Sequence, residues 1–197
     1  SKYGNAMYLD GCFMLSERNQ DYYHDQCISL VPPSAKNLLI IGGGDYAIAS
    51  KLATKRRIKS IHIVEIDIEV INLSKKYFPK HFKLSERTLN KVSLTVQDGM
   101  HFIRKNTERF DCIIIDSTDP VDSAKVLISK SFLKGCFKKL RSGGLIIQQS
   151  GSPIKDTNYI INPLMRKYKN IGFKKINLHS FPMPLYPTGT WSFLSAK

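Results

Sequence analysis

The sequence predicts an α/β fold in which helices cover both faces of a mainly parallel sheet. From residue 36 onward, short apolar segments alternate with segments of helical periodicity, which is typical of parallel strands joined by crossover helices. Residues 110–115 are almost continuously apolar, as expected for a strand that is buried on both faces. A glycine-rich turn directly follows the first of the expected strands. Together these observations indicate a Rossmann-like fold.

The expected elements follow one another in order along residues 36–197. Five strands are expected at 37–41, 60–65, 92–96, 110–115 and 145–149. Helices are expected at 46–55, 68–77, 99–105, 130–140 and 158–168. The run Ser142-Gly143-Gly144 is expected to end the helix at 130–140 before the fifth strand begins. Two further strands, 173–179 and 191–195, are expected to form an antiparallel pair.

Residues 1–35 do not follow this alternation. Two short runs around Gly11, at 6–10 and 12–15, predict a β-hairpin, and 19–30 predicts a helix that ends before two prolines. We therefore expect a short N-terminal hairpin-and-helix segment over 1–35 and a Rossmann-like catalytic domain over 36–197.

Composition excludes several classes of protein. Hydrophobic residues make up 42% of the 197-residue chain, which favours a folded globule over a disordered chain. No apolar run has the length of a membrane span and no signal peptide is evident, so we expect a cytoplasmic protein without a membrane partner. The four cysteines lack C-x-x-C spacing, which argues against a zinc site or a disulfide framework, and no metal is expected.

The net charge of +14 is the one unusual global property. Phosphate neutralisation by Lys and Arg makes a nucleic-acid partner one interpretation. The basic residues are dispersed in short groups, however, and no nucleic-acid-binding motif accompanies them. A solvated lysine-rich surface is therefore the favoured interpretation, and nucleic acid is not the expected partner.

Residues 42–45 form a glycine turn, Gly42-Gly43-Gly44-Asp45, between the first expected strand and its helix. Such a turn lets the backbone approach a ligand closely, and the helix N-terminus adds partial positive charge. By itself the pattern also fits a simple tight turn. Glu65 strengthens the ligand interpretation, because it ends the second strand about twenty residues further on, where a carboxylate can bind a ribose diol.

Two further acidic residues extend the candidate cofactor site. Asp45 would place a negative charge where the phosphate of a dinucleotide should lie, which favours a cationic cofactor such as a sulfonium that carries an amine. Asp98-Gly99 follows the third strand and is suited to contact an adenine edge. Each of these acids is alternatively an ordinary helix N-cap.

The loop after the fourth strand reads Asp116-Ser117-Thr118-Asp119-Pro120. Ligands in open α/β sheets bind beyond the carboxyl ends of the strands, so this loop should face the same crevice as the glycine turn. Two carboxylates three residues apart can act as a general base or hold a cationic substrate. The alternative is an Asx-type turn before proline.

These motifs, in this order, resemble the spermidine synthase family of aminopropyltransferases. The resemblance spans nearly the whole chain. It includes L-D-G at 9–11, Tyr23-His24, the glycine turn, V-E-I-D at 64–67, Asp98-Gly99, the D-S-T-D-P loop, Gln149 and Y-P-T-G-T-W-S-F at 186–193. The family has a Rossmann-like, methyltransferase-type fold. It transfers the aminopropyl group of decarboxylated S-adenosylmethionine to putrescine or a similar amine and releases methylthioadenosine.

The resemblance implies a role for each candidate residue. Asp116 would be the base that takes a proton from the attacking amine. Asp119 would help to hold the polyamine, in a channel lined by Tyr23, Gln149 and Tyr186. The cofactor side would comprise His24, Gly42, Gly44, Asp45 for the aminopropyl ammonium, Glu65 for the ribose, Asp98 for the adenine amine, and Gly99. Decarboxylated S-adenosylmethionine would be a co-substrate without any prosthetic group, and a homodimer is possible.

The chemistry fits these residue types independently of the resemblance. An alkylammonium has a pKa near 10, so it must lose a proton before its nitrogen can attack carbon. A carboxylate beside the amine can bind the cation and then take that proton. The sulfonium needs little activation, so positioning for in-line attack should supply most of the rate. We therefore expect an acidic crevice in a basic protein.

Several positions depart from the family pattern. Tyr46 stands where the family has a further glycine, and it either narrows the cofactor pocket or points elsewhere. Met14 replaces a glutamine that would contact the cofactor. Other departures are Asn19-Gln20 for an acidic pair, Ser50-Lys51 for an Arg-Glu pair, and Asp122-Ser123 for glycine-proline. The N-terminal strand region is expected to be shorter than in full-length members, which bears on the usual oligomer contacts.

Three other functions remain open. An S-adenosylmethionine-dependent methyltransferase would share the fold and the Glu65 contact, although Asp116 would repel the methionine carboxylate of that cofactor. A catalytically silent relative that binds nucleosides or polyamines is kept open by Tyr46 and Met14. A basic nucleic-acid-binding module is the third alternative.

Overall fold

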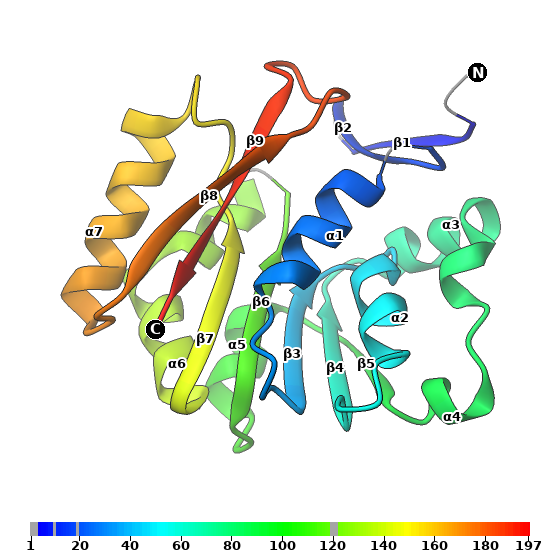
Figure 1. The fold of residues 1–197 in the computed structure, drawn as a ribbon, viewed down its shortest axis with the longest axis horizontal. Helices are drawn as coiled ribbons and strands as arrows, with labels where there is room; N and C mark the ends of the chain where they lie inside the picture. Colours follow the sequence, from blue (N-terminus) through cyan, green and yellow to red (C-terminus); the bar gives the residue numbers. More distant parts are fainter. Residues whose placement is uncertain (1–3, 10, 19, 119–121) are drawn as a thin grey trace.

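The main sheet has seven strands in the order β5-β4-β3-β6-β7-β9-β8 (Figure 1). The computed structural model describes residues 4–9, 11–18, 20–118 and 122–197. Five strands run parallel: β3 (Asn37–Gly42), β4 (Ser60–Glu65), β5 (Val92–Val96), β6 (Phe110–Asp116) and β7 (Leu140–Gln149). The last two, β8 (Ile176–Pro182) and β9 (Thr190–Ala196), are antiparallel to their neighbours.

The strand order reverses between β3 and β6. The chain moves outward from β3 through β4 to β5 and then returns to lay β6 against the other side of β3. Crossovers therefore diverge to opposite faces at this point, which opens a crevice beyond the carboxyl ends of the strands. The β3–β6 register pairs Gly42 with Asp116, so two predicted site segments start side by side.

Helices cover both faces of the sheet, as the sequence predicts (Figure 1). Alternate residues of β3 point to opposite layers: Leu38 and Ile40 join one apolar cluster, and Leu39 and Ile41 join the other. The first cluster packs against α1 (Asp21–Leu30), α2 (Ala47–Ala53) and α3 (Ile68–Tyr77). The second packs against α5 (Gly99–Lys105), α6 (Lys130–Lys139) and α7 (Asn162–Ile171).

The N-terminal hairpin forms a separate two-stranded sheet, β1 (Ala6–Leu9) and β2 (Cys12–Ser16). Met7 and Leu15 anchor it through contacts with Phe78, which lies just after α3. The hairpin therefore lies over the carboxyl-end side of the sheet, next to the glycine turn. Among the described helices, none combines the length and apolarity that a membrane crossing requires.

Most of the predicted elements are confirmed, and the differences have local causes. β7 begins at Leu140, because Ser142-Gly143-Gly144 form part of the strand instead of ending the helix. There the β6–β7 register shifts and Gly143 adopts a φ of 75°, so these glycines accommodate an irregularity in the pairing. β8 begins at Ile176 rather than 173, because Phe173 packs against Tyr168 of α7.

Short elements account for further differences, and the ends of several other elements differ from the prediction by one to three residues. The predicted helix at 158–168 is a π-helical turn, η3 (Thr157–Ile161), that continues into α7. Three short helices were not predicted: η1 (Pro79–Phe82), α4 (Glu86–Leu89) and η2 (Asp122–Ile128). Elements this short carry too few residues to show a periodicity.

Candidate active site

One cavity of about 530 Å³ lies beyond the carboxyl ends of β3, β4 and β6. The hairpin and the segment before β9 close it from the other side. It brings together every predicted site residue that the structure describes: Tyr23, His24, Gly42, Gly44, Asp45, Glu65, Asp98, Gly99, Asp116, Gln149 and Tyr186. Asp119 lies outside the described residues. A volume of this size can hold a nucleoside-sized ligand.

Glycine is required in this turn because two neighbouring chain segments lie too close to it for a side chain to fit. A Cβ atom on Gly42, whose φ is 83°, would lie 2.0 Å from the carbonyl oxygen of Asp116. A Cβ on Gly44 would lie 2.9 Å from Oε2 of Glu65. The backbone N–H of Gly43 donates to the Asp116 carbonyl oxygen at 3.1 Å. The turn therefore holds the ends of β4 and β6 close together, with both carboxylates at the cavity.

Asp116 is the predicted base, and its surroundings favour that chemistry. Burial, reinforced by the negative charges of Asp45 and Glu65, raises the pKa of Asp116 to about 6. The Tyr23 hydroxyl donates to Oδ1 at 2.6 Å and counteracts part of this rise. The other oxygen, Oδ2, lies on the side of Gly43 in the glycine turn. A carboxylate with a pKa near 6 can both lose and accept a proton near neutral pH.

Gln149 lines the cavity, but its side-chain amide forms hydrogen bonds with backbone groups. Its Nε2 donates to the carbonyl oxygens of Ser117 and Thr118, at 3.1 and 3.2 Å. Its Oε1 accepts from the N–H of Gly151 at 3.2 Å. Gln149 therefore holds the chain that follows Asp116, in addition to facing the cavity.

Both carboxylate oxygens of Glu65 accept backbone hydrogen bonds, one of them from the glycine turn. Oε2 accepts from the Gly44 N–H and Oε1 from the Asp67 N–H, each at 3.1 Å. Burial raises the pKa of Glu65, and these backbone donors oppose the rise. The two oxygens together offer about four acceptor sites, which the backbone donors do not fill, so the carboxylate can still accept a hydrogen bond from a diol.

Asp98 is a helix N-cap, as one interpretation of the sequence predicts, and it also faces the cavity. It is the N-cap of α5, because its Oδ1 accepts from the His101 N–H at 2.7 Å. It also lines the cavity, together with Gly99. A Cβ on Gly99 would lie 2.8 Å from Ile41, so this glycine lets α5 approach β3. The adenine contact of Asp98 stays a prediction.

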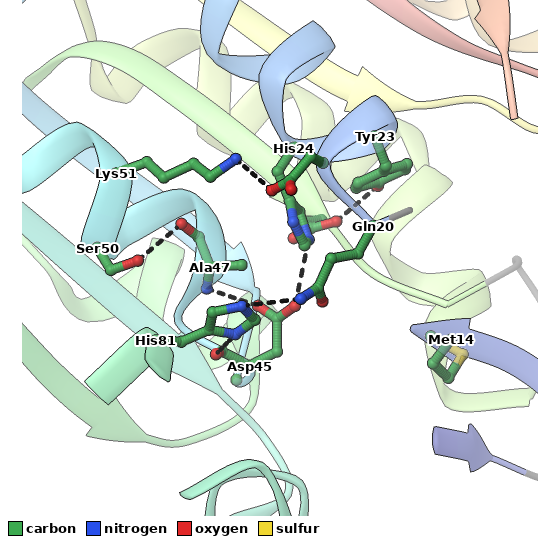
Figure 2. Close-up of polar contacts among 12 residues, drawn as sticks. Met14, Gln20, Tyr23, His24, Asp45, Ala47, Ser50, Lys51 and His81 are labelled. Atoms are coloured by element: carbon green, nitrogen blue, oxygen red, sulfur yellow. Dashed lines mark hydrogen bonds and ion pairs between the residues drawn. The ribbon is translucent and has the colours of Figure 1, made fainter. Parts of the chain in front are cut away.

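Asp45 lies in a buried polar cluster (Figure 2). Its Oδ2 is 3.3 Å from His24 Nε2, and its Oδ1 accepts from the Ala47 N–H at 3.0 Å. Burial acts to raise the pKa of Asp45, but the interactions with His24 and the Ala47 N–H outweigh it and lower the pKa. Asp45 is therefore ionised near neutral pH and can bind a cation.

The structure shows where several departures from the family pattern lie. Tyr46 is absent from the cavity lining and packs its ring on Phe82, with ring centres 4.5 Å apart, so it points elsewhere. Met14 does line the cavity. Lys51 pairs with Asp21 and Asp25 at 2.6 and 2.7 Å, and so ties α2 to α1 (Figure 2). Asn19 lies outside the described residues.

The structure also reveals polar residues that the sequence did not single out. His81 of η1 places its Nδ1 3.0 Å from the carbonyl oxygen of Asp45 and its Nε2 3.1 Å from the Gln20 amide. No sequence signal marked His81, because its partners are a backbone atom and a distant side chain. Trp191 and Leu185 complete the apolar side of the cavity.

Comparisons with known proteins bear on this site. The protein-family model described as the spermine/spermidine synthase domain matches residues 23–197 of this chain. The chain belongs to this family. It is 39% identical over 200 residues to a polyamine aminopropyltransferase of Methanocaldococcus jannaschii, covering 99% of this chain and 67% of the relative. It is 37% identical to the polyamine aminopropyltransferase of Alkaliphilus metalliredigens, covering 98% of this chain and 68% of that protein.

Solved structures agree with this family membership. A spermidine synthase in complex with the transition-state analogue AdoDATO has a TM-score of 0.85 at 27% identity, over 98% of this chain and 66% of that chain. Spermidine synthase from Thermotoga maritima has a TM-score of 0.81 at 26% identity, over 98% and 65%. The chain thus spans less than two thirds of these solved chains and about two thirds of the curated relatives. The predicted fold and family are confirmed.

Proposed function

We propose that this protein is an aminopropyltransferase of the spermidine synthase type. It moves the aminopropyl group of decarboxylated S-adenosylmethionine to putrescine and releases methylthioadenosine, with Asp116 as the general base. The observation that carries the proposal is the half-buried Asp116 carboxylate, with a pKa of about 6, at a cavity that also contains an ionised Asp45. Membership of the spermine/spermidine synthase family supports the same reaction.

In the proposed reaction, the uncharged amine nitrogen attacks the aminopropyl carbon bonded to the sulfonium. A new C–N bond forms, the C–S bond breaks, and its electron pair returns to sulfur to give the neutral thioether. Asp116 takes the proton that the ammonium group must lose before this attack, and the product nitrogen carries the positive charge that the sulfonium loses. The Tyr23 hydroxyl occupies Oδ1, so Oδ2, on the side of the glycine turn, is the oxygen that faces the amine.

The cofactor side of the cavity uses the remaining carboxylates. Glu65, whose backbone donors leave an acceptor site on the carboxylate, binds the ribose diol, and Asp98 binds the adenine amine. Asp45 binds the ammonium group of the aminopropyl arm, because it is ionised and buried beside His24. The amine lies near Tyr23, Gln149 and Tyr186, with Asp119 as a further carboxylate for its second ammonium group.

The electrostatics of the cavity favour this reaction over methyl transfer. S-adenosylmethionine carries a carboxylate that the decarboxylated co-substrate lacks. That carboxylate would meet the negative charges of Asp45 and Asp116, and like charges at short range in a partly buried site are costly. The silent-binder alternative loses one of its two supports, because Tyr46 does not obstruct the cavity. The homodimer, the cytoplasmic location and the division at residue 35 stay predictions.

The test is an incubation with decarboxylated S-adenosylmethionine and a panel of putrescine, cadaverine and spermidine, with methylthioadenosine measured by chromatography. We expect product that depends on both substrates, and a loss of at least about 100-fold in Asp116→Asn. Glu86→Gln, on the exposed helix α4, should retain full activity as the matched control.

Each alternative function has its own signature in this experiment. Adenosylhomocysteine formed from S-adenosylmethionine would identify a methyltransferase. Calorimetric binding of the co-substrate without product from any amine would identify a silent relative. Either outcome would overturn the proposed function.

A further inference from the structure

The short helix η1 contacts the segment that carries Asp45 in two places. His81 Nδ1 lies 3.0 Å from the Asp45 carbonyl oxygen, and the Phe82 ring packs on the Tyr46 ring with centres 4.5 Å apart. A carbonyl oxygen can only accept a hydrogen bond, so Nδ1 of His81 carries the proton in this contact. His81 and Phe82, which are consecutive in η1, therefore contact Asp45 and Tyr46, which are consecutive at the end of the glycine turn.

The backbone at this point needs to be held. Tyr46 has a φ of 63°, and it is the one non-glycine residue with a positive φ among those the structure describes. An L side chain is disfavoured in this left-handed conformation, which persists only where neighbouring structure stabilises it. Asp45 immediately precedes Tyr46, so the peptide that sets the direction of the Asp45 carboxylate is the one that η1 holds.

A second set of contacts fixes His81 itself (Figure 2). Its Nε2 lies 3.1 Å from the side-chain amide of Gln20, which is 2% exposed. In the orientation that satisfies its neighbours, the amide nitrogen donates to the Ser16 carbonyl oxygen at 3.0 Å, and the amide oxygen accepts from Lys80 Nζ and from His81 Nε2, each at 3.1 Å. The imidazole is thus held at both nitrogens, between the end of β2 and the glycine turn.

We propose that His81 is a positioning residue that holds the Asp45 carbonyl group so that the Asp45 carboxylate faces the aminopropyl ammonium of the co-substrate. Gln20 supports it by fixing the imidazole from the opposite side. The inference rests on the proposed function, since it takes Asp45 as the partner of that ammonium. It deepens that function by assigning a role to two residues outside the predicted site.

Two substitutions test the contacts of the two imidazole nitrogens of His81 separately. In His81→Asn the amide nitrogen replaces Nδ1 and can still donate to the Asp45 carbonyl oxygen. In His81→Gln the longer side chain places its amide near the position of Nε2, so the Gln20 contact survives and the Asp45 contact is lost. His179→Gln is the matched control, because His179 contacts Ser195 Oγ at 2.8 Å, and neither residue lines the cavity.

Two ligands separate positioning from general damage to the site. Decarboxylated S-adenosylmethionine carries the ammonium group, whereas methylthioadenosine lacks it. By titration calorimetry, we expect His81→Gln to weaken binding of the co-substrate about tenfold, because one buried hydrogen bond is lost, and to change methylthioadenosine binding less than about twofold. His81→Asn should stay within about threefold of wild type for both ligands, and His179→Gln should match wild type.

Three results would each overturn the positioning role. The first is an equal loss of affinity for both ligands in His81→Gln, and the second is an equal loss of co-substrate affinity in His81→Asn and His81→Gln. The third is no loss of co-substrate affinity in His81→Gln. Thermal unfolding of every variant identifies a variant that fails to fold. In that case Gln20→Leu provides the test. We expect it to weaken binding of the co-substrate about threefold and to leave methylthioadenosine binding unchanged. If co-substrate binding is not selectively weakened, the proposal is overturned. Wild-type protein that binds methylthioadenosine but not the co-substrate would overturn the proposed function, and the positioning role with it.

Discussion

Replacing Asp116 with asparagine should stabilise the fold above pH 6 while it removes the proposed base. Asparagine keeps an oxygen that can accept from the Tyr23 hydroxyl but cannot ionise. In wild-type protein, burial and the charge of Asp45 raise the pKa of Asp116 from 3.8 to about 6. A carboxyl group with a higher pKa in the folded state binds its proton more tightly there. Its contribution to stability is therefore largest at low pH and falls as pH rises through about 6.

The magnitude follows from the two pKa values. Ionising Asp116 in the folded protein costs about 3 kcal/mol relative to the unfolded chain, at about 1.4 kcal/mol per pH unit. The side chain lines an open cavity, so water lowers this cost, and we expect a gain of about 1 to 2 kcal/mol for Asp116→Asn at pH 8. At pH 4 the carboxyl is protonated in the folded protein and close to half protonated in the unfolded chain, so the gain should fall below about 0.5 kcal/mol.

Urea unfolding measured by the fluorescence of Trp191, the single tryptophan, provides the assay. Trp191 is largely buried beside the cavity and should report the loss of packing there. Glu86→Gln controls for the removal of one acidic side chain from an exposed helix. The reasoning is refuted if Asp116→Asn is no more stable than wild type at pH 8, or if its gain is the same at pH 4.

Three further substitutions give distinct readouts. Tyr23→Phe removes a hydrogen bond that lowers the pKa of Asp116, so the acid limb of kcat/KM should move up from about 6 by about one pH unit; an unmoved limb contradicts this. Tyr46→Gly relieves the positive φ but loses packing on Phe82, so urea unfolding should show a net loss of about 1 to 2 kcal/mol, and a gain would contradict the packing argument. Met14→Gln adds a polar group to the cavity and should tighten co-substrate binding several-fold by calorimetry; weaker binding would count against the expected contact.

The strands of the sheet and the helices that cover it could be predicted because each combines a run of buried apolar residues with residues that end the element. β4, β5 and α5 have the bounds that the sequence predicts. The start of β7 could not be predicted, because glycines that usually end an element here lie in an irregular strand pairing. Whether a glycine run ends a strand or bends it depends on the neighbouring strand, which local sequence does not reveal.

The acidic site residues could be predicted from their place in the chain. Parallel strands end at one edge of the sheet, so Glu65 and Asp116 had to lie near the glycine turn once the strands were recognised. His81 and Gln20 could not be predicted in this way. They are 61 residues apart, and one of the contacts of His81 is to a backbone oxygen, which leaves no mark on the sequence.

The departures from the family pattern show how one fold accommodates a substitution. Tyr46 occupies a backbone conformation that suits glycine, yet its ring is directed away from the cavity and onto Phe82. The adjacent His81 contact holds the same peptide from its carbonyl side. Of the two alternatives that the sequence left open for Tyr46, the structure therefore favours the one in which the side chain points away from the cavity.

The central claim is that Asp116 acts as the base in amine-dependent aminopropyl transfer. The most direct measurement is the rate of methylthioadenosine release from decarboxylated S-adenosylmethionine and putrescine between pH 5 and pH 9, in wild type and Asp116→Asn. We expect the wild-type kcat/KM to rise with a pKa near 6, and the variant to lose at least about 100-fold in rate above pH 7, with a smaller loss at pH 5 where Asp116 of wild type is mostly protonated. A variant that releases methylthioadenosine at the wild-type rate would contradict the account.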